Sequence, residues 1–283
     1  MKALITIKAY KRPIYLLKVL KALKKCNNVD NYDIVLVCDG AETIIQQQNL
    51  EAAKLSGLKF YDILGHSHTH GCFVNTKFCL DYTFSKGYDY AIHLEDDTLP
   101  SKYTLDYFQQ VLPRLNDNNL FAACTFHRPC HPGHYETYNN TTGLVAKEWF
   151  DGTGGFGMTK ETYKEINKIG MFGVDYITPK GRTYACKGED WLNEINRIDK
   201  GPGSFVWPFH KYFSKGKKTL FPAVSVVQNI GKYGQHIRDE ESYEKMHKNN
   251  LWLGAFQNVP DKLYWQVNNI ISDNRKFIED GIE

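Results

Sequence analysis

The stretch Tyr90-Ala91-Ile92-His93-Leu94-Glu95-Asp96-Asp97 decides how the rest of the sequence is interpreted. An apolar strand runs directly into three consecutive acids, and a loop follows them. Because side chains alternate between the two faces of a strand, we expect Glu95 and Asp97 to share one face and Asp96 to lie on the other. Three carboxylates at a strand end repel one another unless a cation lies among them. Mg2+ and Mn2+ take oxygen ligands of this kind, so the stretch predicts a metal site that holds a diphosphate, with a solvated acidic turn as the alternative.

The composition is that of a chain able to bury a large core. Its 283 residues, 42% of them hydrophobic, are enough for one large α/β domain. The formal net charge of +3 neither predicts nor excludes nucleic-acid binding. The seven cysteines show no CxxC spacing, which disfavours a zinc ribbon and suits a reducing compartment. Without a signal peptide or an apolar run of about 20 residues, the sequence predicts no membrane span and a cytoplasmic location in a bacterial or phage-infected cell.

Strands and helices alternate along the first hundred residues. The expected strands are 3–7, 33–37, 58–64 and the one leading into the acids, and the expected helices begin at Pro13, 43 and 73. This alternation is typical of a parallel sheet with crossover helices, in which ligands bind beyond the carboxyl ends of the strands. Tyr10, Asp39, the loop 66–70 and the three acids are therefore expected at one edge of the sheet.

The remainder is expected to continue the same domain. The predicted elements are a helix capped by Ser101, strands over 120–126 and 143–150, a glycine-rich loop over 151–158, a helix capped by Thr159, and an edge strand over 220–227 broken by Pro222. Helices packed on the outside are expected after Ile237. We therefore assign one domain to residues 1–240, with a helical extension over 241–283 packed on it.

Taken in order, these motifs resemble a known family. They are an Arg12-Pro13 loop after the first strand, a strand ending at Asp39, the Glu95-Asp96-Asp97 strand end, the glycine-rich segment, Glu189-Asp190 before a helix, and a Gly-x-x-Gly-x-His segment ending at His236. The chain resembles the nucleotide-sugar glycosyltransferases of the GT-A fold. The acidic motif is most similar to the N-acetylglucosaminyltransferase I-like and family-2-like groups with their bacterial and viral members. The resemblance implies an α/β, Rossmann-like domain whose mostly parallel central sheet is flanked by helices.

The resemblance also implies a role for each matching position. The implied contacts of the nucleotide sugar are Tyr10, Arg12, Asp39, Lys77, Glu95, Asp96 and Gly155. Asp97 would bind the Mn2+ or Mg2+ directly, and His236 would complete the coordination. Asp190 would be the catalytic base. Lys77 would face the diphosphate, and the segment 154–157 would form the floor under the donor sugar.

Plainer interpretations of several of these residues stay open. His236 would then be an ordinary loop histidine, Asp190 a carboxylate that favours a helix N-terminus, and Lys77 part of a solvated helix face. Asp39 would merely end its strand. The loop with His66, His68 and His70 has no matching cysteine or acid, so we interpret it as solvated or facing the substrate and not as a zinc site.

The favoured function is an inverting, metal-dependent glycosyltransferase that uses a UDP-sugar. The metal would neutralise the leaving diphosphate, and a carboxylate would accept the proton of the acceptor hydroxyl. The acceptor would be a glycan or a hydroxylated base in phage DNA, the latter suggested by lysines among aromatics over 207–218. A plain exposed hairpin is the simpler interpretation of that segment. A nucleotidyltransferase is the first alternative, although the loop 8–13 lacks its glycine-rich signature. A non-catalytic protein that binds a saccharide or nucleic acid is the second.

Overall fold

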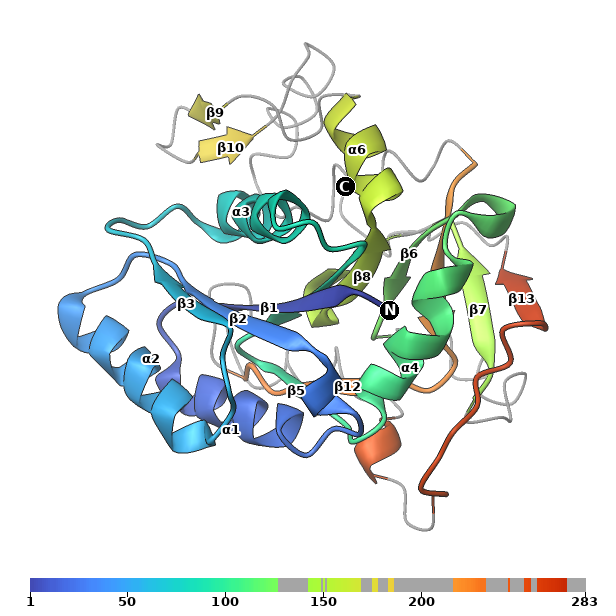
Figure 1. The fold of residues 1–283 in the computed structure, drawn as a ribbon, viewed down its shortest axis with the longest axis horizontal. Coiled ribbons are helices and arrows are strands. Elements are labelled where there is room, and N and C mark those ends of the chain that lie inside the picture. The colour runs from blue at the N-terminus through green and yellow to red at the C-terminus, as the bar shows by residue number, and fades with distance from the viewer. Residues whose placement is uncertain are drawn as a thin grey trace.

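A mixed β-sheet of nine strands, counted over the described residues, runs through the centre of the molecule (Figure 1). The computed structural model describes residues 1–126, 142–148, 150, 152–168, 175–177, 183–185, 216–232, 244, 252–255 and 259–273. The order of the strands is β13-β7-β11-β6-β8-β4-β1-β2-β3. A two-stranded ribbon joins β5 to β12, and another joins β9 to β10.

The N-terminal half of the sheet is parallel, as the alternation of elements predicts. Its strands are β1 (Ala3–Ala9), β2 (Asp33–Cys38), β3 (Asp62–Gly65) and β4 (Tyr90–Glu95). The connecting helices are α1 (Pro13–Leu23), α2 (Thr43–Ser56) and α3 (Cys72–Ser85). Pro13 opens α1 because its fixed φ suits the first helical position. Gly57 ends α2 with a φ of +66°, a conformation that glycine adopts without strain.

The other half of the sheet is mixed. Its strands are β6 (Leu120–Cys124), β7 (Leu144–Lys147), β8 (Phe156–Thr159), β11 (Lys218–Pro222) and β13 (Ile270–Asp273). The small ribbons consist of β5 (Thr98–Pro100), β9 (Asp175–Ile177), β10 (Thr183–Ala185) and β12 (Val227–Asn229). Here β8 runs antiparallel to both β4 and β6, and so joins the two halves.

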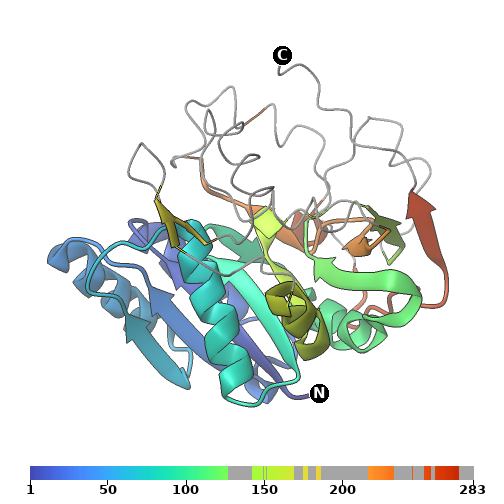
Figure 2. The ribbon, with the colours of Figure 1, turned by 90° about the horizontal axis from the view of Figure 1, so that it is seen from above.

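Helices cover both faces of the sheet. On one face lie α1, α2 and α4 (Thr104–Val111), and on the other lie α3 and α6 (Lys160–Lys168) (Figures 1 and 2). Short 3-10 helices span Val29–Asn31, Leu112–Arg114, Asp117–Asn119, Gly152–Gly154 and Leu253–Ala255. The alternation within β1 divides the core, because Ile5 and Ile7 pack on the α1 side while Leu4 packs on the α3 side.

Four expectations about local structure are wrong in part. Residues 156–159 form the central strand β8 and not a loop, because Phe156 and Met158 are buried and only the glycines gave the stretch a loop-like composition. Pro222 is the last residue of β11, an inner strand and not an edge strand. The helix expected from Ser101 begins at Thr104, although the Ser101 hydroxyl does accept a hydrogen bond from the Tyr103 amide. Residues 270–273 form strand β13, where helices were expected.

The cap expected at Thr159 is confirmed. Thr159 caps α6, because its hydroxyl accepts a hydrogen bond from the Thr162 amide at 3.0 Å. The cysteines in the described residues, Cys26, Cys38, Cys72, Cys79 and Cys124, form no disulfide, and all but Cys72 are buried. In the described part of the chain, no helix has both the length and the apolar character needed to cross a bilayer.

Candidate functional site

The carboxyl ends of β1, β2 and β4 bring most of the predicted residues together. The Asp39 amide donates to the carbonyl of Ala9, so the ends of β1 and β2 are directly joined. The Tyr10 amide donates to Asp96 Oδ2 at 3.1 Å, which ties the loop after β1 to the acids after β4. The predicted gathering of Tyr10, Asp39 and the acids at one edge of the sheet is therefore confirmed.

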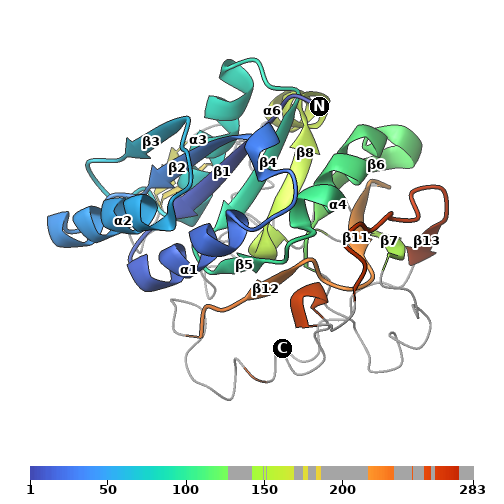
Figure 3. The ribbon, with the colours of Figure 1, turned by 60° about the horizontal axis from the view of Figure 1, so that its bottom comes forward.

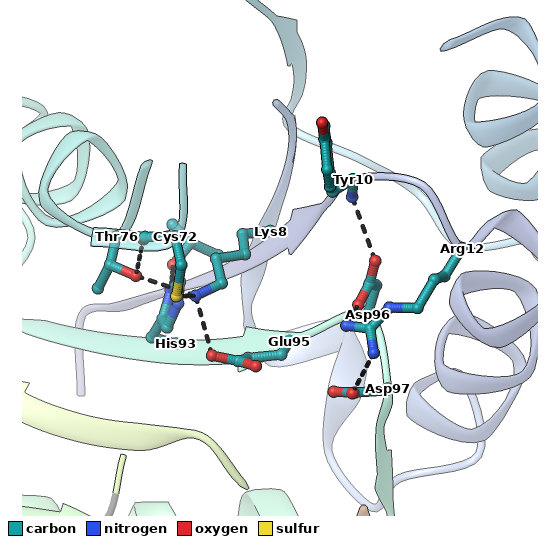
Figure 4. Close-up of polar contacts among 10 residues, drawn as sticks. Lys8, Tyr10, Arg12, Cys72, Thr76, His93, Glu95, Asp96 and Asp97 are labelled. Carbon is teal, nitrogen blue, oxygen red and sulfur yellow. Dashed lines mark hydrogen bonds and ion pairs between the residues drawn. The ribbon is translucent and has the colours of Figure 1, made fainter. Parts of the chain in front are cut away.

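Arg12 holds two of the three acids. Its guanidinium contacts Asp97 Oδ2 at 2.5 Å through Nη1 and Asp96 Oδ1 through Nη2 (Figure 4). Glu95 points elsewhere. The expectation that Glu95 and Asp97 share one face is wrong, because β4 ends at Glu95 and the next two residues form a turn that places Asp96 and Asp97 beside the same cation.

Glu95 pairs with Lys8, a residue that the sequence analysis missed. Lys8 Nζ lies 2.9 Å from Glu95 Oε1 and also contacts Cys72 Sγ and Thr76 Oγ1 at the start of α3 (Figure 4). Lys8 is directly opposite Glu95 in the register of β1 and β4. The sequence predicts a loop over 8–13, but β1 continues to Ala9 and so places Lys8 inside the strand, on its α3 side. Burial acts to lower the pKa of Lys8, but Cys72 and Glu95 outweigh it and raise the pKa, so the ammonium stays charged.

Burial dominates the protonation of the acids. It raises the pKa of Asp96 to about 6, although Arg12 acts in the opposite direction. Burial also raises the pKa of Glu95 above its ordinary value, against the effect of Lys8. Three carboxylates thus share two basic side chains, and the cluster keeps a net negative charge when all are ionised.

One oxygen of the cluster fits a divalent cation. Asp97 Oδ1 is buried and has no hydrogen-bond partner, whereas Oδ2 is held by Arg12. A buried carboxylate oxygen without a partner is costly, and a hard cation is the ligand that suits it. Among the described residues, no three His, Cys, Asp or Glu side chains are grouped as metal ligands. His236, the second predicted ligand, lies outside the described residues.

Asp39 organises the loop that precedes α3. Asp39 Oδ1 accepts hydrogen bonds from the amides of Gly40 and His70, and Oδ2 accepts one from Gly71. The Tyr10 hydroxyl meets Thr69 of the same loop at 3.3 Å. Asp39 therefore has a clear structural role, and its contact with a nucleotide stays a prediction.

The histidines of this loop lie in mutual contact. The ring centroids of His66 and His70 are 4.6 Å apart, and those of His68 and His70 are 4.3 Å apart. Burial and the neighbouring His70 lower the pKa of His66, which favours its neutral form. His68 is exposed while the other two are partly buried.

The remaining predicted residues differ in their placement. Gly155 packs against β4, where an added Cβ would lie 2.8 Å from the carbonyl oxygen of His93, two residues before the acids begin in the sequence. Lys77 stands apart, because its ammonium pairs with Asp81 one turn further along α3. This pairing does not favour the predicted contact with a diphosphate. Asp190, the predicted base, lies outside the described residues.

Comparisons with known proteins identify the fold. No protein-family model matches the sequence, and no curated protein matches it. A crystal structure of GalNAc-T7 with UDP, GalNAc and Mn2+ has a TM-score of 0.53 at 12% identity, covering 88% of this chain and 48% of that one. TarS 1-349 from S. aureus has a TM-score of 0.46 at 11% identity, covering 88% and 64% of the two chains.

A third similar structure is the mannosyltransferase PcManGT from Pyrobaculum calidifontis in complex with GDP-Man and Mn2+. It has a TM-score of 0.45 at 13% identity, covering 76% of this chain and 69% of that one. The present chain spans about half the length of GalNAc-T7, and its match to a longer TarS chain covers 22% of that chain. The likeness to GalNAc-T7 concerns the fold alone, and it agrees with the central sheet and its flanking helices: the chain has the GT-A fold.

Proposed function

We propose that this protein is a metal-dependent glycosyltransferase that moves a sugar from a UDP-sugar to an acceptor hydroxyl, with inversion at the anomeric carbon. The observation that carries the proposal is the buried acidic cluster after β4, in which Arg12 holds Asp96 and Asp97 while Asp97 Oδ1 has no partner. The cluster lies beyond the carboxyl ends of the strands, where ligands bind in open sheets of this type. The UDP and Mn2+ in the GalNAc-T7 structure support the same donor class.

The described residues would prepare the donor site. A Mn2+ or Mg2+ bound at Asp97 would supply Lewis-acid neutralisation of the leaving diphosphate. Arg12 keeps the two carboxylates side by side, because its fork can donate to both at once. Asp96 fixes the backbone of Tyr10, whose ring would then lie against the uracil. Asp39 would shape the same side of the nucleotide site, because it holds the loop with His66, His68 and His70 in place.

The chemical step would depend on residues outside the described part of the chain. Asp190 would accept the proton from the acceptor hydroxyl as that oxygen attacks. A single base opposite the leaving group gives an in-line attack, which inverts the anomeric carbon. His236 would be a further ligand of the cation. Both assignments derive from the family resemblance of the sequence motifs.

The acceptor is proposed to be a glycan or a hydroxylated DNA base. The DNA alternative draws on four lysines that stand among aromatic residues in the sequence, namely Lys211, Lys215, Lys217 and Lys218. A loss of DNA binding with rising salt would favour the nucleic-acid acceptor, since phosphate contacts release counterions. Salt-insensitive transfer to a saccharide would favour the glycan.

Donor hydrolysis tests the proposal. Wild-type protein with Mn2+ and a panel of UDP-sugars should release UDP slowly, and Asp97→Ala should abolish the release. Asp117→Ala is the control, because that exposed carboxylate lies in a 3-10 turn away from the cluster. Release that persists at the wild-type rate in Asp97→Ala would contradict the metal assignment.

A second variant tests the proposed base. Asp190→Asn should keep donor binding and lose transfer, and unchanged transfer would rule out Asp190 as the base.

A further inference from the structure

The backbone of the segment after β12 lies directly on the acidic cluster. β12 pairs with β5, the strand that follows Asp97, and this ribbon runs past α1 (Figure 3). The Ile230 amide donates to the Asp97 carbonyl at 2.8 Å, one residue beyond the paired strands. The Gly231 amide then donates to Asn229 Oδ1 at 2.9 Å, which turns the chain across the carboxylate of Asp97.

No side chain fits at position 231. A Cβ built there would lie 2.1 Å from Asp97 Oδ2, and 3.0 Å from Arg12 Nη1. Gly231 has no positive φ, so glycine is required here for space and not for backbone conformation. Both neighbours are constrained, since Asp97 Oδ2 and Arg12 Nη1 are bonded to each other. A methyl group could enter only by moving this ion pair.

The two oxygens of Asp97 therefore have different surroundings. Oδ2 is enclosed by the Arg12 guanidinium and the Gly231 backbone, while Oδ1 is buried without a partner. Because the carboxylate is held through Oδ2, its orientation is fixed, and the direction in which Oδ1 points is fixed with it. Resting on the proposed function, we propose that Gly231 is a positioning residue, which with Arg12 closes off Asp97 Oδ2 and leaves Oδ1 as the oxygen offered to the divalent cation.

Metal binding provides the first test. Mn2+ is titrated into the protein with UDP, and free Mn2+ is measured by electron paramagnetic resonance, so that no turnover is needed. Gly231→Ala should weaken Mn2+ binding by at least about tenfold, the effect expected when the support of a metal ligand is disturbed. The matched control is Gly65→Ala, because a Cβ at Gly65 meets no atom within 4 Å and its φ is not positive.

A double-mutant cycle provides the second test, which needs no metal. Gly231→Ala should lower the melting temperature in the wild-type background, but much less in the Asp97→Ala background, where the obstructing carboxylate is gone. If Gly231→Ala does not fold alone, the double variant should fold. An equal drop in both backgrounds, or unchanged Mn2+ affinity in folded Gly231→Ala, would overturn the inference. A wild-type protein that binds no Mn2+ with UDP would overturn the proposed function instead, and the cycle would still report on the contact.

Discussion

Lys8 and Arg12 neutralise neighbouring acids of one tripeptide in two different ways. Lys8 meets Glu95 on the α3 side, and its side chain is 11% exposed. Arg12 meets Asp96 and Asp97 at the start of α1, and its side chain is 27% exposed. Lys8 also contacts Cys72 and Thr76, so its pair is closed within the protein. The Arg12 pair instead leaves Asp97 Oδ1 without a partner.

This difference indicates a division of labour within Glu95-Asp96-Asp97. The Lys8–Glu95 pair fixes β1 to β4 and to α3, and it offers little to a ligand. Asp96 ties the Tyr10 loop to the strand end through two contacts. Of the three acids, Asp97 is the one with a buried carboxylate oxygen that has no hydrogen-bond partner, and a cation would satisfy that oxygen. A run of three acids at a strand end is therefore not three equivalent ligands, because neighbouring cations decide which oxygens stay available.

Breaking the closed pair should have the largest effect on stability. Lys8→Met leaves the Glu95 carboxylate buried without its cation, and we expect the free energy of unfolding to fall by about 3–5 kcal/mol. Urea unfolding measures it. Lys8→Met with Glu95→Gln should recover part of the loss, because no buried charge remains. Lys102→Met is the control for an exposed ion pair and should leave the unfolding free energy unchanged within error. A loss below about 1 kcal/mol for Lys8→Met would contradict the closed-pair interpretation.

Breaking the ion pairs of Arg12 should lower the free energy of unfolding less than breaking the Lys8–Glu95 pair, and it should change how the protein responds to metal. Arg12→Met is expected to lower the free energy of unfolding by about 1–3 kcal/mol without metal, since the guanidinium is partly exposed and Asp96 can protonate. Adding Mn2+ should then raise the melting temperature less in this variant than in wild type, because Asp97 is no longer held through Oδ2 and a more weakly bound cation stabilises the folded state less. Lys8→Met should keep the wild-type response to Mn2+. An equal change in melting temperature with Mn2+ in Arg12→Met and Lys8→Met would contradict the interpretation that only the ion pairs of Arg12 belong to the metal site.

The elements of the fold were predictable where local chemistry decides them. Pro13 begins α1 and Gly57 ends α2, and both positions are recognisable from single residues. The gathering of Asp39 and the acids follows from the parallel arrangement that strand–helix alternation implies. β8 was not predicted, because Gly155 and Gly157 give the stretch the composition of a loop. Phe156 and Met158 are buried only because β4 and β6 pair with the strand on either side.

The site was less predictable because its contacts depend on register and on distant chain. The Lys8–Glu95 pair requires the alignment of β1 with β4, which no local pattern contains. The turn after Glu95, which brings Asp97 beside Asp96, depends on β5 pairing with β12 more than 120 residues away. Gly231 is recognisable as a loop glycine, but only the structure shows that its backbone rests on Asp97.

The smallest of the predicted effects concerns the face of β4 that carries the Lys8–Glu95 pair. It is a change in how the free energy of unfolding depends on pH. His93 is fully buried on that side, with Nδ1 3.1 Å from the Thr6 hydroxyl and Nε2 without a partner. Burial, together with the charge of Lys8, lowers the pKa of His93 well below its ordinary value of 6.5. The unfolded chain binds a proton as the pH falls through 6.5 while the folded protein does not, so the stability that neutral His93 provides is present above this pH and is lost below it.

His93→Gln removes this titration and keeps a group that can hydrogen-bond to Thr6. Near pH 5.5 the wild-type protein should have lost about 1 kcal/mol more of its unfolding free energy, relative to pH 8, than the variant has. Urea unfolding of both proteins at the two pH values gives the difference, in which the titration of the other groups cancels. His68→Gln is the matched control, because it makes the same substitution at an exposed histidine. Parallel stability curves for wild type and His93→Gln would mean that His93 gains its proton in the folded protein as easily as in the unfolded chain, and the Lys8 side of β4 would then be open to water and not closed.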